Sequence, residues 1–231
     1  MEFPDLRQAA AAGCPDLVAV GGDLSVERLL LAYRTGIFPW TINPITWWCP
    51  HPRAIFELGN FHVPRSLAKV LKRCAWGIDS SSPVPGSFTV TRDRAFRQVI
   101  EQCASVPGRQ TWITAEFIAA YVRLHEAGHA HSVECWQNGK LAGGIYGVVI
   151  GGLFAGESMF HHVNNASKVA LSFLRQHLHQ RGFVLFDIQM LTPVTRQLGA
   201  IEISREEYLR RLDAARATAS FFSDPEQPAD G

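Results

Sequence analysis

The sequence predicts an α+β (mixed α/β) fold in which a small N-terminal domain packs on a larger domain built around one sheet. In the second half of the chain, hydrophobic patterns follow one another in the order strand, strand, helix, strand, helix, strand. The 231 residues suffice for one large domain or two unequal ones, and 47% are hydrophobic, enough for a sizeable core. We expect the small domain to span residues 1–57 and the large domain residues 58–231.

The first fifty residues contain one clear helix and an unusual aromatic segment. The helix is expected over residues 26–35, because Ser25 can cap its N-terminus and Gly36 can end it. The next segment, residues 38–53, is interrupted by prolines and is predicted to be a loop. It carries several large rings: Phe38, Trp40, Trp47 and Trp48. These rings either pack the small domain onto the main body or form a stacking surface for a ligand.

The middle of the chain is predicted to be mostly helical. A short basic helix is expected over residues 64–73, and a polar surface loop over residues 80–87. A strand and two helices follow, over residues 88–91, 92–105 and 115–127, and Gly128 ends the last of them.

Basic residues are concentrated in one region, although the formal net charge of the chain is only +1. Between residues 53 and 97 the sequence has eight basic and three acidic residues. The candidate contacts to a phosphate backbone are Arg53, Arg65, Lys69, Lys72 and Arg73. Such a region is consistent with nucleic-acid binding, and equally with an ordinary solvated surface.

The second half of the chain carries the predicted sheet. Strands are expected over residues 131–137 and 141–155, with Asn138-Gly139 as the hairpin turn between them. The uncharged run over 141–156 has 16 residues, fewer than the roughly 20 that a membrane-spanning helix needs. We therefore interpret it as two buried strands joined by a tight turn. The remaining elements are a helix over 165–180 capped by Asn165 and closed by Gly182, a strand over 183–190, a short helix over 193–198, a strand over 200–203, a helix over 205–218 and a disordered tail after about residue 223.

Polar residues in the strand over 183–190 mark the candidate site. Asp187 and Gln189 are two residues apart and are expected on one face of this strand, toward a common ligand. Glu157, expected on the turn before the preceding helix, can reach the same place through a right-handed crossover. Together they would form a small polar cluster within apolar walls. The alternative for Asp187 is a structural bond to the backbone or to an arginine, since an unpaired buried carboxylate is costly.

The cysteines indicate reduced thiols in the cytoplasm. The sequence has five of them, an odd number, with no CxxC spacing. The N-terminus has no signal-peptide pattern, and no membrane segment is expected.

One motif resembles a metal site, but its context argues against that interpretation. His125-Glu126-Ala127-Gly128-His129 matches the pattern H-E-x-x-H, whose two histidines must lie one helical turn apart. Gly128 is expected to end the helix, which would take His129 off the helical face. The phosphate-binding patterns G-x-x-x-x-G-K-[ST] and G-x-G-x-x-G do not occur. We therefore expect no metal and no cofactor.

Several longer strings of residues carry a family resemblance. They are Gly21-Gly22-Asp23-Leu24-Ser25, Gly36-Ile37-Phe38-Pro39-Trp40, Trp47-Trp48-Cys49-Pro50, Pro52-Arg53, Thr111-Trp112-Ile113-Thr114, His125-Glu126-Ala127-Gly128-His129-Ala130-His131-Ser132, Gly156-Glu157-Ser158-Met159-Phe160, Asn165-Ala166-Ser167-Lys168 and Asp187-Ile188-Gln189. With these strings in order and nearly end to end, the chain resembles the bacterial leucyl/phenylalanyl-tRNA–protein transferases. The H-E-x-x-H match then belongs to a family string without a metal role.

The resemblance implies an aminoacyltransferase that forms a peptide bond without a ribosome, ATP or metal. The family moves Leu or Phe, and sometimes Met, from aminoacyl-tRNA to the N-terminal α-amine of proteins that begin with Arg or Lys, which marks these proteins for degradation. The larger domain is expected to be similar to the acetyltransferase (GNAT-like) fold, with a mixed, mainly antiparallel sheet. A monomer is the family default.

The resemblance also implies roles for individual residues. The catalytic pair matches Asp187 and Gln189, and the tryptophans that stack on the terminal adenosine match Trp40 and Trp112. We expect Asp187 to act on the acceptor amine through Gln189, as a direct base or within a relay. The loop over 80–87 looks like an insertion relative to the family. The implied substrate pocket comprises Phe154, Gly156, Glu157, Ser158, Met159, Leu171 and Ile188.

Two other functional classes are alternatives. An acyl-CoA N-acyltransferase would share the fold, but the string closest to its pyrophosphate-binding turn, Arg196-Gln197-Leu198-Gly199-Ala200-Ile201, lacks the last required residue and lies beyond the candidate strand. A non-catalytic RNA-binding module would explain the basic region and the tryptophans. It would leave Glu157, Asp187 and Gln189 without a role.

Overall fold

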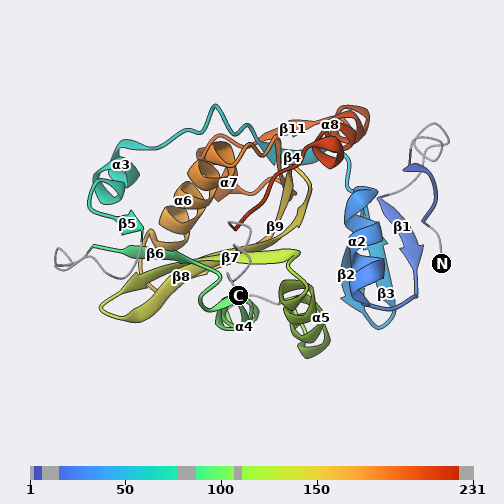
Figure 1. Cartoon of the computed structure of the whole chain (residues 1–231), viewed down its shortest axis with the longest axis horizontal. Helices are drawn as coiled ribbons and strands as arrows, with labels where there is room; N and C mark the ends of the chain where they lie inside the picture. The colour runs from blue at the N-terminus through green and yellow to red at the C-terminus, as the bar shows by residue number, and fades with distance from the viewer. Residues whose placement is uncertain (1–2, 7–15, 77–86, 107–110, 224–231) are drawn as a thin grey trace, which may run out of the picture.

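Two sheets of different size organise the chain (Figure 1). The structure is a computed structural model that describes residues 3–6, 16–76, 87–106 and 111–223. The smaller sheet consists of β1 (Leu17–Val20), β2 (Phe38–Ile42) and β3 (Ile45–Trp48), in the order β1-β3-β2. Helix α2 (Val26–Arg34) packs against β2, and the Ser25 side chain caps it as predicted.

The aromatic segment forms most of the small sheet, which corrects the prediction of a loop there. Strands β2 and β3 pair as a tight hairpin, with Ile42 opposite Ile45. Proline is tolerated on edge strands, and Pro39 lies in β2 at the edge of the sheet, so its presence did not exclude a strand. Trp47 is fully buried and donates a hydrogen bond from Nε1 to the Gly21 carbonyl at 2.8 Å. This ring therefore packs the small sheet and is not a stacking surface.

The large sheet is mixed and mainly antiparallel, as predicted. Its strands are β4 (Arg53–Phe56), β5 (Ala75–Trp76), β6 (Thr89–Arg92), β7 (Ala130–Gln137), β8 (Lys140–Ile150), β9 (Leu153–His161), β10 (Leu185–Gln189) and β11 (Ile201–Ile203). Their order is β11-β4-β10-β9-β8-β7-β6-β5. Neighbours pair in parallel at β5–β6 and β9–β10, and the other neighbouring pairs are antiparallel.

Strand β4 lies just before the predicted domain boundary. It pairs with both β10 and β11, so residues that the prediction placed in the small domain (1–57) belong to the large sheet. The small sheet ends at Trp48, and the change from one sheet to the other therefore lies between Trp48 and Arg53.

Helices cover both faces of the large sheet. On one face, α3 (Arg65–Leu71) and α6 (Ala166–Gln180) pack in a core that includes Leu67, Val169 and Phe186. On the other face, α4 (Phe96–Ala104), α5 (Ala115–Glu126) and α8 (Arg205–Ala217) share a second core with α2. A short helix, α7 (Pro193–Gln197), follows β10. The second core joins the small sheet to the large one.

Most other predicted elements are confirmed to within a few residues. The turn at Asn138-Gly139 has φ angles of 52° and 71°, which suits the two-residue hairpin that was predicted. The uncharged run forms nearly all of β8 and the start of β9, with a turn at Gly151-Gly152 between them. Helix α4 starts later than predicted, at Phe96, because the chain first turns at Asp93 with a φ of 55°. The predicted loop over 80–87, except its last residue, and the tail from 224 lie outside the described residues.

In the part of the chain that the structure describes, no helix combines the length and hydrophobicity needed to cross a bilayer. Cys49, Cys74 and Cys135 are free thiols. Burial raises the pKa of the Cys74 and Cys135 thiols, which keeps them protonated and poorly nucleophilic.

Candidate active site

Strands β9 and β10 separate at the place where the site was predicted. Their parallel ladder ends at the Ala155–Asp187 pair, although β9 continues to His161. Each strand also carries one extra residue at this point, Glu157 in β9 and Ile188 in β10. Such bulges bend a strand and redirect its side chains, and they are frequent beside active sites.

A cavity of about 550 Å³ lies between the two diverging strands and the start of α6. This volume is within the range of small-molecule sites. Four residues of the predicted site, Phe154, Trp40, Trp112 and Asp187, are not among those that line it. Seven others do line it: Gly156, Glu157, Ser158, Met159, Leu171, Ile188 and Gln189.

Gln189 has an unusual conformation that Asp187 supports. Its φ is 56°, in the left-handed region that residues other than glycine rarely adopt. Its backbone N–H donates to Asp187 Oδ1 at 2.9 Å, while its side-chain Nε2 donates to Glu157 Oε1 at 3.2 Å. Asp187 therefore holds the main chain of Gln189, and the side chain reaches Glu157. The bulge interrupts the regular alternation on which the prediction of a shared face for Asp187 and Gln189 depended.

Asp187 is enclosed by its partners and does not line the cavity. Arg53 donates from Nε to Oδ1 at 2.9 Å and from Nη2 to Oδ2 at 2.7 Å, and both side chains are only 1% exposed. The Tyr208 hydroxyl donates to Oδ2 at 3.0 Å. A structural bond to an arginine, one of the two alternatives considered for Asp187, is thus the arrangement found.

The same ion pair corrects the assignment of Arg53 to a phosphate-binding surface. The guanidinium lies over the Tyr208 ring at 4.3 Å and over the Phe38 ring at 5.1 Å. Burial acts to lower the pKa of Arg53, but the charge and hydrogen bonds of Asp187, together with the influence of Tyr208, outweigh burial and raise it, so Arg53 stays cationic. A buried cation with a fixed carboxylate partner is not available to nucleic acid. Arg53 instead ties β2, β4, β10 and α8 together.

Glu157 is the carboxylate that faces the cavity. It lies in β9 and not on a turn as expected, and helix α6 carries the chain across to the parallel strand β10. The Tyr121 hydroxyl on α5 donates to its Oε2 at 3.2 Å and is hydrogen-bonded to the Tyr33 hydroxyl on α2 at 2.5 Å. Burial raises the pKa of Glu157 to about 7, although the hydrogen bonds from both tyrosines oppose this rise. At neutral pH the carboxyl is therefore divided between its two protonation states.

Of the two tryptophans predicted to stack on adenosine, Trp40 lies in β2 of the small sheet and Trp112 lies just before α5. Trp40 is half-buried and meets Trp48 edge-on, with 5.3 Å between ring centroids. Trp112 is half-buried and meets Phe117 edge-on at 5.2 Å. Both rings pack against the core that contains α2 and α5. Each is therefore anchored on one side and accessible on another.

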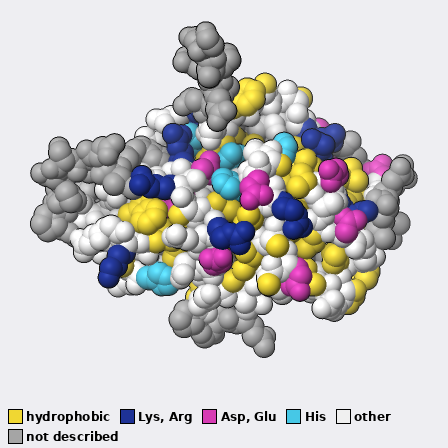
Figure 2. Space-filling model, turned by 60° about the horizontal axis from the view of Figure 1, so that its bottom comes forward, with side chains coloured by type: hydrophobic (Ala, Val, Ile, Leu, Met, Phe, Trp, Pro, Cys, Tyr) yellow, Lys and Arg dark blue, Asp and Glu magenta, His cyan; other side chains and the backbone are white. Residues whose placement is uncertain are grey.

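The four other predicted phosphate contacts are exposed at α3. Arg65 and Lys69 lie on the helix, and Lys72 and Arg73 follow it. Helix α3 buries Leu67 and packs against α6, so its charged residues lie on the outside. On the face shown in Figure 2, basic and acidic side chains are interspersed and form no patch of one sign. The exposure of these four residues keeps α3 a predicted surface for phosphates.

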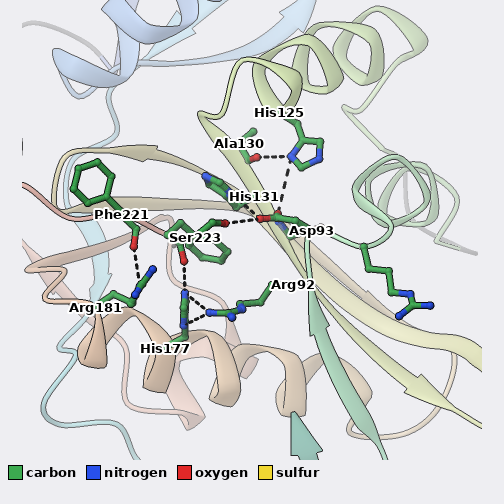
Figure 3. A network of polar contacts seen from close by, with 12 residues as sticks. Arg92, Asp93, His125, Ala130, His131, His177, Arg181, Phe221 and Ser223 are labelled. Atoms are coloured by element: carbon green, nitrogen blue, oxygen red, sulfur yellow. Dashed lines mark hydrogen bonds and ion pairs between the residues drawn. The ribbon is translucent and has the colours of Figure 1, made fainter. Parts of the chain in front are cut away.

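A second polar cluster contains the possible metal ligands (Figure 3). Within the described residues, Asp93, His125 and His131 bring one ligand atom each to within 4.8 Å of one another. These atoms already have partners: His131 Nδ1 is 2.8 Å from Asp93 Oδ2, and His125 Nδ1 is 2.7 Å from the Ala130 carbonyl. Ser223 donates to the same aspartate at 3.3 Å. The cluster thus holds the C-terminal segment, and a metal ion would have to displace these bonds.

The H-E-x-x-H geometry does not form in this cluster. Helix α5 ends at Glu126, and Gly128 follows with a φ of 78°. His129 is not part of the ligand group, so its predicted departure from the helical face is confirmed. A larger cavity of about 820 Å³ lies nearby and is lined by His131 and Phe222, but by none of the residues predicted for the site. The smaller cavity, where those residues converge, is the candidate active site.

Several residues of the site were not foreseen from the sequence. Tyr33 and Tyr121 lie on helices whose periodicity marks them only as core residues. Ser167 and Lys168, at the start of α6, line the cavity together with Thr192. Lys168 belongs to one of the family strings, which was the available signal for it.

Comparisons with known proteins agree on one family. Residues 55–213 match the family described as leucyl/phenylalanyl-tRNA protein transferase, and residues 22–51 match its N-terminal domain. A leucyl/phenylalanyl-tRNA–protein transferase of Solidesulfovibrio magneticus is 48% identical over 219 residues, covering 93% of this chain and 83% of that protein. Its counterpart in Syntrophotalea carbinolica is 47% identical over 218 residues, covering 92% and 88%.

Solved structures overlap with the chain only loosely. An aminoglycoside acetyltransferase from an uncultured soil sample has a TM-score of 0.36 at 14% identity, covering 58% of this chain and 90% of that chain. The structure of L-PGS from Bacillus licheniformis has a TM-score of 0.40 at 14% identity, covering 82% and 57%. Overlaps of this size support no assignment of function.

Proposed function

The chain belongs to the leucyl/phenylalanyl-tRNA–protein transferase family, and we propose that its acceptors are proteins whose N-terminal residue is Arg or Lys. Transfer of an amino acid from leucyl- or phenylalanyl-tRNA to a protein follows from the family. The N-terminal α-amine of the acceptor is the proposed target, Met is a proposed third donor, and the product would act as an N-degron. We further propose a cytoplasmic monomer that needs no ATP, metal or cofactor, because the aminoacyl ester is already activated.

The cavity between β9 and β10 is the observation that supports this proposal. Met159, Leu171 and Ile188 give it an apolar wall that suits a Leu or Phe side chain. Glu157 and Gln189 give it a polar side, where a carboxylate and a carboxamide are joined by a hydrogen bond. An aminoacyl ester whose side chain lay against the apolar wall would have its carbonyl near this polar pair.

Asp187 and Gln189, the expected catalytic pair, would act at different distances from the substrate. Gln189 lines the cavity and would orient the ester carbonyl or the acceptor amine. Asp187 would act as a positioning residue, because it holds the Gln189 backbone N–H and is itself held by Arg53. Alignment of two reactants can lower a barrier by up to about 7–11 kcal/mol in favourable cases.

The tRNA would be bound by stacking and by charge. Its terminal adenine fits a stack on Trp40 or Trp112, which are anchored but partly accessible. Stacking of one base on an aromatic ring contributes about 1–3 kcal/mol. The phosphates of the acceptor stem would contact the exposed basic residues at α3, which makes binding dependent on salt.

Trp112→Ala is predicted to raise KM for aminoacyl-tRNA more than it lowers kcat. The lost stacking energy, about 1–3 kcal/mol, corresponds to a rise in KM of roughly 5- to 150-fold. Steady-state kinetics at saturating acceptor peptide measure both constants. Trp112→Phe, which keeps a ring, should show a smaller rise, and an unchanged KM in the alanine variant would rule out the stacking role.

Transfer of labelled leucine tests the proposed function directly. Leu-tRNA is incubated with a peptide that begins with Arg or with a matched peptide that begins with Ala, without ATP and with a chelator. Label is expected in the Arg peptide alone. Equal labelling of both peptides would contradict the acceptor assignment. Acylation that requires added acetyl-CoA in place of Leu-tRNA would contradict the assignment of aminoacyl-tRNA as the donor.

A further inference from the structure

We propose that Glu157 accepts the proton that the acceptor amine releases during peptide-bond formation; this inference rests on the proposed transfer at the β9–β10 cavity. The reaction must remove a proton from the attacking nitrogen, and two carboxylates lie nearby. A proton acceptor has to come within hydrogen-bond distance of that nitrogen. Asp187 is 1% exposed and is paired with Arg53, whereas Glu157 lines the cavity. Access therefore favours Glu157.

The hydrogen bonds of Glu157 suit a group that changes its charge. Its Oε2 accepts from Tyr121 at 3.2 Å, and its Oε1 accepts from Gln189 Nε2 at 3.2 Å. Both donors stabilise the ionised carboxylate, but neither is charged, so neither fixes it in that form as a salt bridge would. The hydroxyls of Tyr121 and Tyr33 are hydrogen-bonded to each other and can reorient when Glu157 takes up a proton.

The groups that face Glu157 from the surrounding elements leave its pKa close to neutral pH. They are Tyr33 on α2, Tyr121 on α5, Tyr146 on β8, Asp187 on β10 and Arg53 on β4. Asp187 and Arg53 form a pair of opposite charges, and the others are neutral hydroxyls. Burial therefore dominates and raises the pKa of Glu157 to about 7. A general base works best when its pKa is near the working pH.

A third hydroxyl lies beside this group. Tyr146 is fully buried against Tyr121, and its Oη has no hydrogen-bond partner among the described residues. The charge of Glu157 adds to burial in raising the pKa of Tyr146. Tyr146 therefore stays protonated and does not compete with Glu157 for the proton.

The proposed step balances over the whole reaction. The neutral α-amine attacks the ester carbonyl carbon, and the N–C bond forms. The nitrogen then carries one proton too many, and this proton passes to the Glu157 carboxylate. When the C–O bond to the ribose breaks, the leaving oxygen takes the proton from Glu157 and becomes a hydroxyl. The carboxylate is restored, and no further reactant is required.

Glu157→Gln tests this role, because an amide keeps the shape of the side chain: its oxygen can still accept from Gln189, and its NH2 group can donate to the Tyr121 hydroxyl. In the wild-type enzyme two groups should limit kcat/KM at low pH: Glu157, with a pKa of about 7, and the acceptor amine, at about 7.7–8.0. A logarithmic plot should therefore rise with a slope of about two below both values. The variant should show a slope of about one and a loss in kcat on the order of 100-fold, with KM for aminoacyl-tRNA unchanged.

Two further variants keep the test independent of that substitution. Tyr121→Phe removes a hydrogen bond that lowers the pKa of Glu157, so the acidic limb of the pH profile should move to higher pH. Glu157→Asp keeps a carboxylate and should recover the slope of about two at a reduced rate. A merely structural role for Glu157 predicts neither result.

The outcomes separate this inference from the proposed function. If the wild-type enzyme transfers no amino acid to any peptide, the proposed function itself fails. If it does transfer, but Glu157→Gln keeps the wild-type rate and slope, only the role of Glu157 fails. A defect confined to KM for the Arg peptide, with kcat and slope intact, would instead make Glu157 a counter-ion for the cationic side chain and would overturn the proton-acceptor role.

Discussion

Asp187 and Glu157 lie on neighbouring strands, yet their surroundings are opposite. Asp187 is closed off by Arg53 and Tyr208 in a buried cluster. Glu157 faces a cavity, and within the described part of the chain its hydrogen bonds come from neutral groups. Asp187 therefore has a permanent cation as its partner, whereas the charge of Glu157 can change near pH 7. Nearness to the site does not define the role of a carboxylate; its partners do.

The largest effect is expected from Arg53→Ala, which leaves Asp187 buried without its cation. Removal of one partner from a buried ion pair costs about 3–5 kcal/mol of unfolding free energy. Urea denaturation at neutral pH measures this loss. The double variant Arg53→Met/Asp187→Leu should recover much of it, because no charge then remains buried. If Arg53→Ala unfolds at nearly the wild-type urea concentration, the closed cluster is not what holds β4 to β10.

A smaller effect is expected when one hydroxyl is removed from either carboxylate. Tyr208→Phe deletes a hydrogen bond to the ion-paired Asp187 and should cost about 1.5–3 kcal/mol. Tyr121→Phe is the matched control at Glu157, a partly protonated group, and should cost only about 0.5–1.5 kcal/mol. The same urea titration ranks the two variants. Equal losses would mean that the two carboxylates do not differ in charge as described.

At neutral pH the smallest effect on stability is expected from Glu157→Gln, and this effect should depend on pH. The pKa of Glu157 is about 7 in the folded protein and 4.5 as the reference value. Between these values the folded protein keeps a proton that the unfolded chain has lost, so the stability from this group is complete below about pH 4.5 and is lost as the pH rises through about 7. The variant cannot titrate there, so its stability relative to wild type should increase by on the order of 3 kcal/mol from about pH 4.5 to about pH 8. Parallel stability curves would show that Glu157 does not titrate in this window.

Most of the helices and strands could be predicted because their signals are local. Ser25 caps the N-terminus of α2, and Asn138-Gly139 forms the turn at which β7 ends and β8 begins. These boundaries are set by residues that are adjacent in the sequence. The small sheet could not be predicted in the same way. Pro39 indicates a loop unless its strand is known to be an edge, and the position of a strand within a sheet is not a local property.

The site was predictable in outline but not in its internal roles. A right-handed crossover between parallel strands was enough to bring Glu157 toward Gln189. The partner of Asp187 was out of reach, because Arg53 precedes it by 134 residues and pairs with it only through the sheet. One signal was available: each is a lone charge in an otherwise apolar strand, and two such charges of opposite sign are expected to meet.

The extra residue at Glu157 divides β9 into two halves with opposite side-chain orientation. Before it, Phe154 faces the core on the α6 side and Ala155 faces the core on the α5 side. After it, the odd-numbered Met159 packs on the α6 side and the even-numbered Phe160 on the α5 side. Loss of one residue at this point would exchange the sides of the sheet on which Met159 and Phe160 lie, and both cores would have to repack. The number of residues in this strand is therefore under tighter constraint than the identity of any one of them, and a one-codon deletion here should be less tolerated than a substitution.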